Sequence, residues 1–251
     1  MGGLPYQNYI FDLYGTLVDI HTDEDRPAAW AALARFYSYY GARYTSQQLR
    51  AAYHRLVETR EAGLSALRQD SHEAHPEIEL GGVFLELFRR RGADADEALA
   101  LHAGQFFRAM STDWLRLYDG TLEMLRTLRR RGGRLFLLSN AQAIFTAYEM
   151  RALGLAGAFD GVYLSSNYGC KKPDRRFFDI LLAKEGLDPA RSIMVGNDGA
   201  CDIAGAKAAG LAACYVRTAL SPDEPAPAAD LCLPAMDMPR LAALLAGDIP
   251  G

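Results

Sequence analysis

The sequence predicts an α/β protein: a doubly wound parallel sheet, forming a Rossmann-like core, with an inserted all-helical cap domain. Within residues 9–18 an apolar run ends at Asp12 and a Gly-Thr turn follows, as is typical of a buried parallel strand at the carboxyl edge of a sheet. Helical periodicity alone follows, up to about residue 117. From residue 118, strand and helix patterns alternate, which implies right-handed crossovers and helices on both sheet faces. We expect a core domain of residues 1–19 and 115–251 and a cap domain of residues 20–114.

The composition gives no sign of a nucleic-acid or membrane partner. Half of the 251 residues are apolar, the net charge is -4 and the isoelectric point is near 5.8, which leaves no basic footprint for nucleic acid or anionic membranes. The four cysteines lack the spacing of a zinc site or a disulfide framework. The sequence shows neither a signal-peptide pattern nor an apolar run of about 20 residues. We expect a cytoplasmic monomer or homodimer with a small-molecule substrate and no nucleic-acid or membrane partner.

The cap region is expected to be helical throughout. A polar passage leads from Asp19 to Pro27, which suits the first turn of a helix that ends near Tyr40, before Gly41. Helical periodicity continues over residues 47–61, 78–91 and 95–117. We therefore expect no strand between residues 19 and 117.

The core region is expected to supply the other strands of the sheet and the helices that cover it. The predicted strands are residues 134–138, 161–164, 192–195, 212–217 and 230–233. The predicted helices are residues 122–131, 143–153, 174–185, 202–209 and 239–245. Asp174 is expected to cap the third of these helices.

Polar side chains follow the ends of four of the predicted elements. They are Asp12 with Thr16, Ser139 with Asn140, the loop of Lys172, and Asn197 and Asp198 with Asp202. Each motif alone is typical of an ordinary turn, loop or helix cap. Parallel sheets bind ligands beyond the carboxyl ends of their strands. Because all four groups of polar residues are expected at that edge, we favour one common site.

The pattern predicts a role for each of these residues. Asp12 would be a nucleophile or metal ligand, with Gly15 permitting a sharp exit from the strand and the Thr16 hydroxyl fixing the carboxylate. Lys172 would offset the charge of an anionic substrate. The side chains of Ser139 and Asn140 would donate hydrogen bonds to substrate oxygens.

A magnesium site is also expected at this edge of the sheet. Asp12, Asp198 and Asp202, together with a backbone carbonyl at Tyr14, offer the hard oxygen ligands that Mg²⁺ prefers. The ion would shield these carboxylates from an incoming phosphate group.

These motifs resemble those of the haloacid dehalogenase superfamily of hydrolases, and the resemblance covers almost the full chain. The matching stretches are Phe11 to Leu17, Leu138 to Asn140, Lys172 with Pro173, and Val195 to Asp198 with Asp202. The resemblance implies hydrolysis with Asp12 as nucleophile. It also implies that the helical insertion is a cap that closes over the sheet edge, excludes water and selects the substrate.

Position 14 departs from the phosphatases of this superfamily, whereas the last matching stretch agrees with them in its spacing. The phosphatases place a second Asp, the general acid and base, where this chain has Tyr14, and a phenol with a pKa near 10 is a poor base at neutral pH. The 2-haloacid dehalogenases of the superfamily also carry Asp-x-Tyr-Gly-Thr. They need no general acid at the Tyr position, because halide leaves without a proton. However, Asp198 and Asp202 are spaced like the metal-binding pair of the phosphatases, although a strict alignment places Asn197 at the metal position.

Three hypotheses follow. The first is a Mg²⁺-dependent phosphatase for a small phosphorylated metabolite, in which Tyr14 orients water without deprotonating it. The second is a metal-independent 2-haloacid dehalogenase, and the third is a catalytically degenerate member that binds a phosphorylated ligand. Specificity is expected in the cap, where the polar candidates are His21, Asp23, His72, His75 and Glu77.

Overall fold

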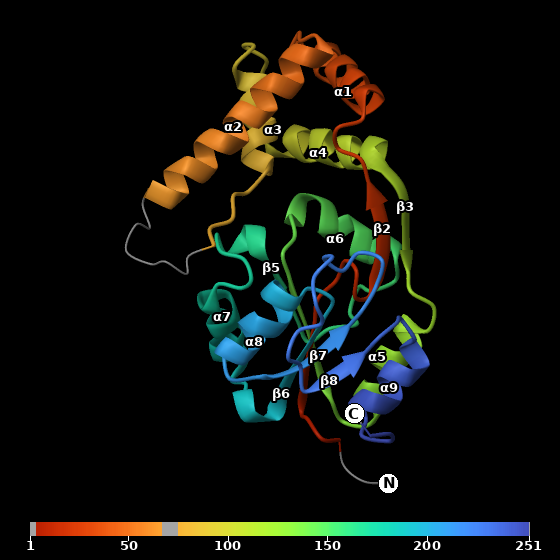
Figure 1. Cartoon of the computed structure of the whole chain (residues 1–251). Coiled ribbons are helices and arrows are strands. Elements are labelled where there is room, and N and C mark those ends of the chain that lie inside the picture. Colours follow the sequence, from red (N-terminus) through yellow and green to blue (C-terminus); the bar gives the residue numbers. More distant parts are fainter. Residues whose placement is uncertain (1–3, 67–74, 251) are drawn as a thin grey trace.

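A computed structural model describes residues 4–66 and 75–250 and shows a sheet flanked by helices beneath a group of helices (Figure 1). The sheet has six parallel strands in the order β5-β4-β1-β6-β7-β8. They are β1 (Asn8–Phe11), β4 (Arg134–Ser139), β5 (Gly161–Leu164), β6 (Ser192–Gly196), β7 (Ala212–Val216) and β8 (Leu231–Leu233). The predicted doubly wound α/β fold is confirmed, with the first strand in the middle of the sheet.

Both faces of the sheet are covered, as alternate residues of β1 demonstrate. Tyr9 and Phe11 pack in a cluster with α5 (Thr121–Arg130), α6 (Ala143–Ala152) and α9 (Met238–Leu245). Ile10 packs in a second cluster with α7 (Arg175–Glu185) and α8 (Gly205–Ala208). All four residues of β1 are buried, which is why its last three residues, Tyr9 to Phe11, read as an apolar run.

The cap region has its own apolar core. Four helices surround it: α1 (Pro27–Tyr39), α2 (Ser46–Ala66), α3 (Gly81–Arg89) and α4 (Glu97–Ser111). Aromatic side chains such as Trp30, Tyr37 and Phe107 fill this core. Ile144 and Phe145 of α6 also insert into it, so the beginning of α6 is a point at which the cap rests on the sheet domain.

The expectation that residues 19–117 contain no strand was wrong. Strands β2 (Val18–Thr22) and β3 (Thr112–Leu117) pair antiparallel and join the cap to the sheet domain (Figure 1). Val18 and Ile20 are buried and alternate with more exposed residues, which is a strand pattern. The strands are stabilised by partners far away in the sequence, such as His21 opposite Trp114. Periodicity is read over neighbouring residues, so it does not detect such pairs. The expected boundaries at residues 19–20 and 114–115 lie inside these strands, and the division into domains stays a prediction.

The helix that follows β6 begins earlier than expected. A π-helical turn spans Gly199–Ala204 and continues into α8, and Asp198 is its N-cap. Asp202 therefore lies inside the helical segment and does not cap it. Single 3₁₀ turns occur at Ser165–Asn167 and Pro189–Arg191. Within the described ranges, no helix is both long enough and apolar enough to cross a membrane.

Candidate active site

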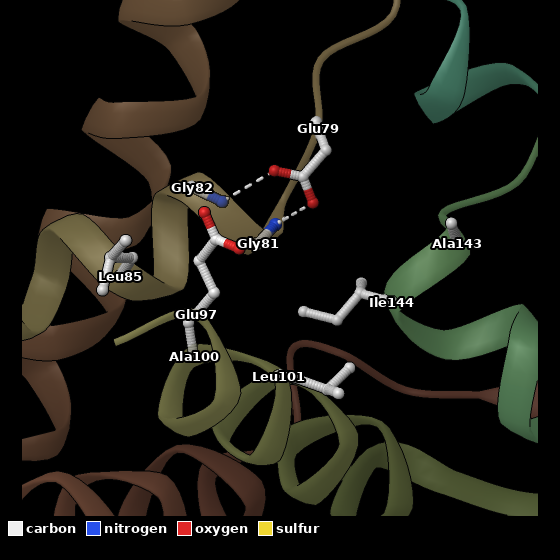
Figure 2. A pocket seen from close by; sticks show the side chains of 9 residues that line it. All are labelled: Glu79, Gly81, Gly82, Leu85, Glu97, Ala100, Leu101, Ala143 and Ile144. Atoms are coloured by element: carbon white, nitrogen blue, oxygen red, sulfur yellow. Dashed lines mark hydrogen bonds between the residues drawn. The ribbon is translucent and has the colours of Figure 1, made fainter. Parts of the chain in front are cut away.

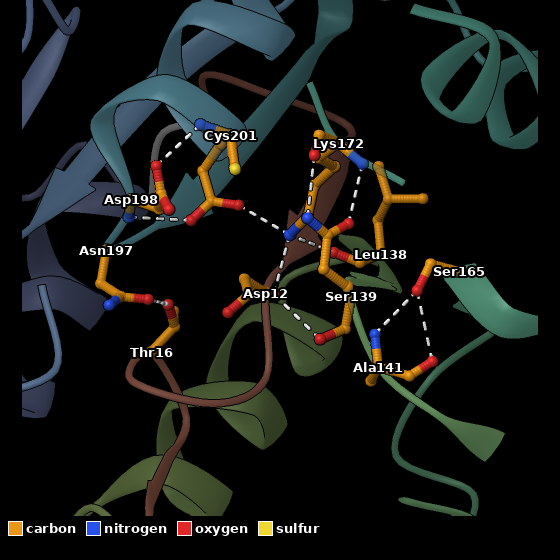
Figure 3. A network of polar contacts seen from close by, with 12 residues as sticks. Asp12, Thr16, Leu138, Ser139, Ala141, Ser165, Lys172, Asn197, Asp198 and Cys201 are labelled. Carbon is orange, nitrogen blue, oxygen red and sulfur yellow. Dashed lines mark hydrogen bonds and ion pairs between the residues drawn. The ribbon is translucent and has the colours of Figure 1, made fainter. Parts of the chain in front are cut away.

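Loops from four elements meet at the carboxyl edge of the sheet (Figure 3). Asp12 follows β1, Ser139 ends β4, Asn197 follows β6, and Lys172 lies in the loop before α7. Together with their neighbours they line a cavity of about 200 Å³. The other lining residues are Tyr14, Asn140, Asp198, Cys201, Asp202 and Leu220. The structure thus brings together the side chains that the sequence placed at separate strand ends.

Lys172 is the centre of the site. Its ammonium nitrogen lies 2.7 Å from Oδ1 of Asp12 and 2.6 Å from Oδ1 of Asp202, and it also donates to the carbonyl of Leu138 at 2.8 Å. The side chain is only 2 % exposed. Burial alone would lower the pKa of Lys172, but the two carboxylates outweigh burial and raise it, so the amine stays charged.

Asp12 is held in one orientation with one of its oxygens engaged. Oδ1 accepts hydrogen bonds from Ser139 Oγ at 3.0 Å and from the ammonium of Lys172. Among the described residues, the side-chain hydrogen bonds to the Asp12 carboxylate all reach Oδ1 and not Oδ2. The Asp12 amide donates to the carbonyl of Val195 in β6 at 3.0 Å, which anchors the residue to the sheet. Oδ2 is therefore the oxygen available for attack. Cys201 is a poor alternative nucleophile, because burial raises its pKa to about 12.

Thr16 does not bond Asp12, contrary to the sequence-based expectation. Its hydroxyl donates to Asn197 Oδ1 at 3.1 Å and so ties the β1 loop to the β6 loop. Gly15 makes this approach possible, since its φ is +83° and a Cβ atom there would lie 2.5 Å from the Asn197 amide nitrogen. Gly15 therefore provides the sharp exit that the sequence predicts, and Thr16 fixes the loop and not the carboxylate.

Asn140 holds the backbone of Lys172. Its Oδ1 accepts from the Lys172 amide at 2.7 Å, and its Nδ2 donates to the Lys172 carbonyl at 2.9 Å. We expected a donor to substrate oxygens, whereas both ends of this side-chain amide already bond the Lys172 loop. Ser139, by contrast, points at Asp12 itself.

Asp202 and Asp198 differ from the expected metal-binding pair. Asp202 Oδ1 pairs with Lys172, and Oδ2 accepts from the Asp198 amide at 3.0 Å, so both oxygens are engaged. Burial raises the pKa of Asp202 to about 6, although Lys172 opposes this. Asp198 uses Oδ1 to cap the following helical turn. In the part of the chain that the structure describes, no three acidic, histidine or cysteine side chains form a ready-made metal cluster.

The hydroxyl of Tyr14 is committed to helix α6. It makes a short hydrogen bond to Glu149 Oε2 and lies 2.9 Å from Thr146 Oγ1. Arg108 of α4 in turn donates to Glu149 Oε1 at 2.7 Å, and its guanidinium lies 5.6 Å from the centre of the Tyr14 ring. Burial and then the Glu149 carboxylate raise the pKa of Tyr14 above its ordinary range. The expectation that this hydroxyl orients water at Asp12 is therefore not supported.

Sequence reasoning missed the partners of Tyr14. Thr146 and Glu149 lie more than 130 residues beyond it, and Arg108 belongs to the cap. A glutamate inside a helix is usually a solvated residue, whereas Glu149 is buried. No local pattern distinguishes the two cases.

The polar cap candidates lie in different places. His21 pairs with Asp113 and stacks on Trp114 in the β2–β3 ribbon, and Asp23 pairs with Arg26. His75 and Glu77 lie in the segment before α3 and contact the sheet domain. His72 is outside the described residues.

Comparison with known proteins finds one family along most of the chain. Residues 6–210 match the haloacid dehalogenase-like hydrolases. A phosphoserine phosphatase of Thermus thermophilus is 34% identical over 149 residues, which are 59% of this chain and 59% of that protein. A glyceraldehyde 3-phosphate phosphatase of Methanothermobacter thermautotrophicus is 37% identical over 110 residues, 44% of this chain and 49% of that protein. The chain thus spans between about half and three fifths of these curated relatives.

A dehalogenase is also among the relatives. An (S)-2-haloacid dehalogenase of a Pseudomonas species is 28% identical over 216 residues, 82% of this chain and 80% of that protein. Among solved structures, a 2-haloacid dehalogenase of Pseudomonas syringae has a TM-score of 0.64 at 22% identity and covers 97% of this chain and 100% of its own. A HAD phosphatase of Thermococcus onnurineus has a TM-score of 0.59 at 21% identity and covers 96% and 98%. At these identities the structures demonstrate the shared fold alone.

Proposed function

The chain belongs to the haloacid dehalogenase-like hydrolases, and from this membership we propose that it hydrolyses a small phosphorylated metabolite with Asp12 as nucleophile. The observation that carries the proposal is the pair of contacts to Asp12 Oδ1. Lys172 at 2.7 Å and Ser139 at 3.0 Å hold one carboxylate oxygen at the wall of a cavity of about 200 Å³. The phosphatases among the relatives support phosphate as the group that is transferred.

The reaction would proceed in two displacements. Asp12 Oδ2 attacks phosphorus, the bond from phosphorus to the leaving oxygen breaks with its electron pair, and an aspartyl-phosphate forms. Water then attacks phosphorus, and Asp12 is regenerated as inorganic phosphate and a proton are released. Lys172 offsets the negative charge that two anionic groups bring together, and Ser139 keeps the attacking carboxylate in place.

The environment of Tyr14 restricts the leaving group. A neutral phenol held by Glu149 and Thr146 supplies no proton to a departing alkoxide. General acid catalysis typically contributes 10²–10⁴-fold, about 3–5 kcal/mol of barrier, and an alkyl phosphate would lack it. We therefore expect acyl or aryl phosphates, whose leaving groups depart without a proton, to be better substrates than alkyl phosphates.

Mg²⁺ fits the charge of the site. The cavity wall carries Asp12, Asp198 and Asp202 against the single ammonium of Lys172, and this surplus of carboxylate would repel a phosphate ester. Mg²⁺ is commonly held by one or two carboxylates and keeps several waters. Asp12, the main-chain oxygen of Tyr14, and Asn197 or Asp198 would hold it, whereas the engaged oxygens of Asp202 fit this role less well. When bound, the ion would neutralise charge on the phosphoryl oxygens.

A metal-independent 2-haloacid dehalogenase is the second candidate. The engaged hydroxyl of Tyr14 and the engaged oxygens of Asp202 favour it, because halide leaves without a proton and the route requires no metal. In that route Asp12 displaces halide from carbon, and water attacks the resulting ester at the Asp12 carbonyl carbon. Both candidates keep Asp12 as the nucleophile.

Two assays with and without a chelator separate these functions. Purified protein is incubated with p-nitrophenyl phosphate and a panel of phosphorylated metabolites, and in parallel with both enantiomers of 2-chloropropionate. We expect phosphate release that stops with chelator and returns with added Mg²⁺. Halide release that survives the chelator would establish the dehalogenase instead. Phosphate binding without any turnover would identify a binding protein and exclude both reactions.

A further inference from the structure

The segment of residues 75–80, here called the strap, contacts the sheet domain and then runs into α3 of the cap (Figure 1). It precedes α3 in the chain and belongs to the cap by sequence. Its hydrogen bonds nevertheless reach the loops that hold Lys172 and Asn140. The cap is therefore connected to the sheet domain at the strap as well as at the β2–β3 ribbon.

The main chain of the strap pairs with the loop of Lys172. Pro76 lies opposite Cys170 in an antiparallel bridge. On either side of this pair, the Lys171 amide donates to the His75 carbonyl at 2.9 Å and the Glu77 amide donates to the Gly169 carbonyl at 3.2 Å. The strap thus pairs with residues 169–171 through this isolated bridge, directly before Lys172.

The His75 amide extends this contact past Lys172. It donates at 3.2 Å to Oδ2 of Asp174, the residue that caps α7. Asp174 is itself bonded to Lys171, since its amide donates to the Lys171 carbonyl at 3.0 Å. The strap therefore holds the chain on both sides of Lys172.

The side chain of Glu77 forms a second route to the site. Its Oε2 accepts from Ser165 Oγ at 2.9 Å, and its Oε1 accepts from Gln142 Nε2 at 3.2 Å. Ser165 Oγ in turn accepts from the Ala141 amide at 2.9 Å, as Figure 3 shows. Ala141 directly follows Asn140, whose side chain holds both polar groups of the Lys172 backbone.

We infer that Glu77 is a positioning residue through which the strap holds Lys172 against Asp12. The inference rests on the proposed function only in the catalytic role it gives Lys172. Lys172 is buried, and its ammonium meets three acceptors within 2.8 Å, so a small displacement of its loop breaks contacts to both carboxylates. Misplacement by about 1 Å can lower catalytic rates by about 10²-fold. Cap position and lysine position are then coupled through two sets of hydrogen bonds.

The neighbouring Glu79 provides a matched control. Its carboxylate accepts from the amides of Gly81 and Gly82 and so caps the beginning of α3, beside a cavity of about 480 Å³ between α3, α4 and α6 (Figure 2). Glu77 and Glu79 carry the same charge in the same strap. Only Glu77 is bonded to the Ser165 and Gln142 side chains.

Hydrogen–deuterium exchange tests the coupling without any substrate. In Glu77→Ala, we expect exchange in peptides covering residues 139–143 and 169–173 to accelerate about tenfold, since a hydrogen bond to a charged group stabilises by about 1.5 kcal/mol or more. In Glu79→Ala, acceleration should be confined to the first turn of α3. Glu77→Gln keeps an acceptor for Ser165 and should exchange nearly as the parent does. Parental exchange at residues 169–173 in Glu77→Ala would overturn the inference.

Steady-state kinetics with p-nitrophenyl phosphate test the consequence. We expect Glu77→Ala to lower kcat about 10²-fold with a much smaller change in KM, and Glu77→Gln to recover most of the loss. Faster exchange at residues 169–173 with an unchanged kcat would overturn the positioning role. If the parent hydrolyses no phosphate ester, the proposed function fails, while the exchange experiment still decides whether the strap holds the loop.

Discussion

The ammonium of Lys172 lies 2.7 Å from Oδ1 of Asp12, and the same nitrogen is 2.6 Å from Asp202. One buried cation is thus shared by the proposed nucleophile and by a carboxylate that the sequence had suggested as a metal ligand. Asp202 orients Lys172, and Lys172 orients Asp12.

Replacing Lys172 should impair both folding and activity. Lys172→Met leaves Asp12 and Asp202 buried without their cation, which should lower the free energy of unfolding by about 3–5 kcal/mol and kcat by about 10²-fold or more. Lys207→Met is the control, because its pair with Asp230 is largely exposed and should contribute less than about 1 kcal/mol. Urea denaturation of both variants measures the difference. Equal effects would show that the shared cation has no special role.

Removing the hydroxyl of Tyr14 should affect stability more than chemistry. In the unfolded chain this phenol ionises near pH 10, whereas burial keeps it protonated to higher pH in the folded protein. The folded state therefore binds more protons above about pH 10, and the stability of the parent falls there as pH rises. Tyr14→Phe lacks this dependence, so its deficit in unfolding free energy should shrink from pH 8 to pH 11.

The same variant tests whether Tyr14 takes part in proton transfer. We expect kcat of Tyr14→Phe to stay within about tenfold of the parent, with the same shape of pH–rate profile. An alkaline limb that is present in the parent and lost in Tyr14→Phe would show that the phenol titrates during the reaction.

A carboxylate at position 14 should change leaving-group preference. Tyr14→Asp supplies the missing general acid and should raise kcat/KM for alkyl phosphates, by up to about 10²–10⁴-fold, more than for p-nitrophenyl phosphate. Loss of the donor to Glu149 should cost about 1–3 kcal/mol of stability. Tyr14→Asn is the control, because the Asn side chain has the same shape as that of Asp but no titratable proton. Identical substrate preference in the two variants would mean that the pocket itself disfavours alkyl phosphates.

The convergence of Asp12, Ser139 and Lys172 could be predicted because parallel strands place their carboxyl ends at one edge of the sheet. Strand β5 was predicted at its observed bounds because its residues form a short apolar run. Both features depend on periodicity and chain order, which the sequence displays directly.

Side-chain partners could not be predicted in the same way. Tyr14 was expected to face the reaction, but Glu149, distant in sequence, takes its hydroxyl. Thr16 bonds Asn197 and not Asp12. Asp202 bonds Lys172, although its spacing from Asp198 suggested a metal-binding pair. Glu77 was noted as a polar residue of the cap, and its contacts to the sheet domain became visible only in the structure. Residue types restrict which bonds can form, but the packing of distant elements selects among them.

Cross-linking the strap tests whether it stays docked during turnover. Pro76 and Cys170 lie opposite each other in an antiparallel bridge, in which paired Cα atoms are about 4.5–5.5 Å apart, a separation that a disulfide can span. We expect oxidised Pro76→Cys to keep most of the parental kcat. The control is the parent treated with the same oxidant. Loss of activity on oxidation, with recovery on reduction, would show that the strap must detach.

The identity of the nucleophile is tested most directly by a single turnover in heavy-oxygen water. The reaction is quenched with acid, and mass spectrometry is applied to the peptide covering residues 8–17 and to the released phosphate. We predict one phosphoryl group on Asp12, label in the phosphate, and none in the Asp12 carboxylate, because water attacks phosphorus. Parental phosphate release by Asp12→Asn, with no adduct on the parental peptide, would contradict the account.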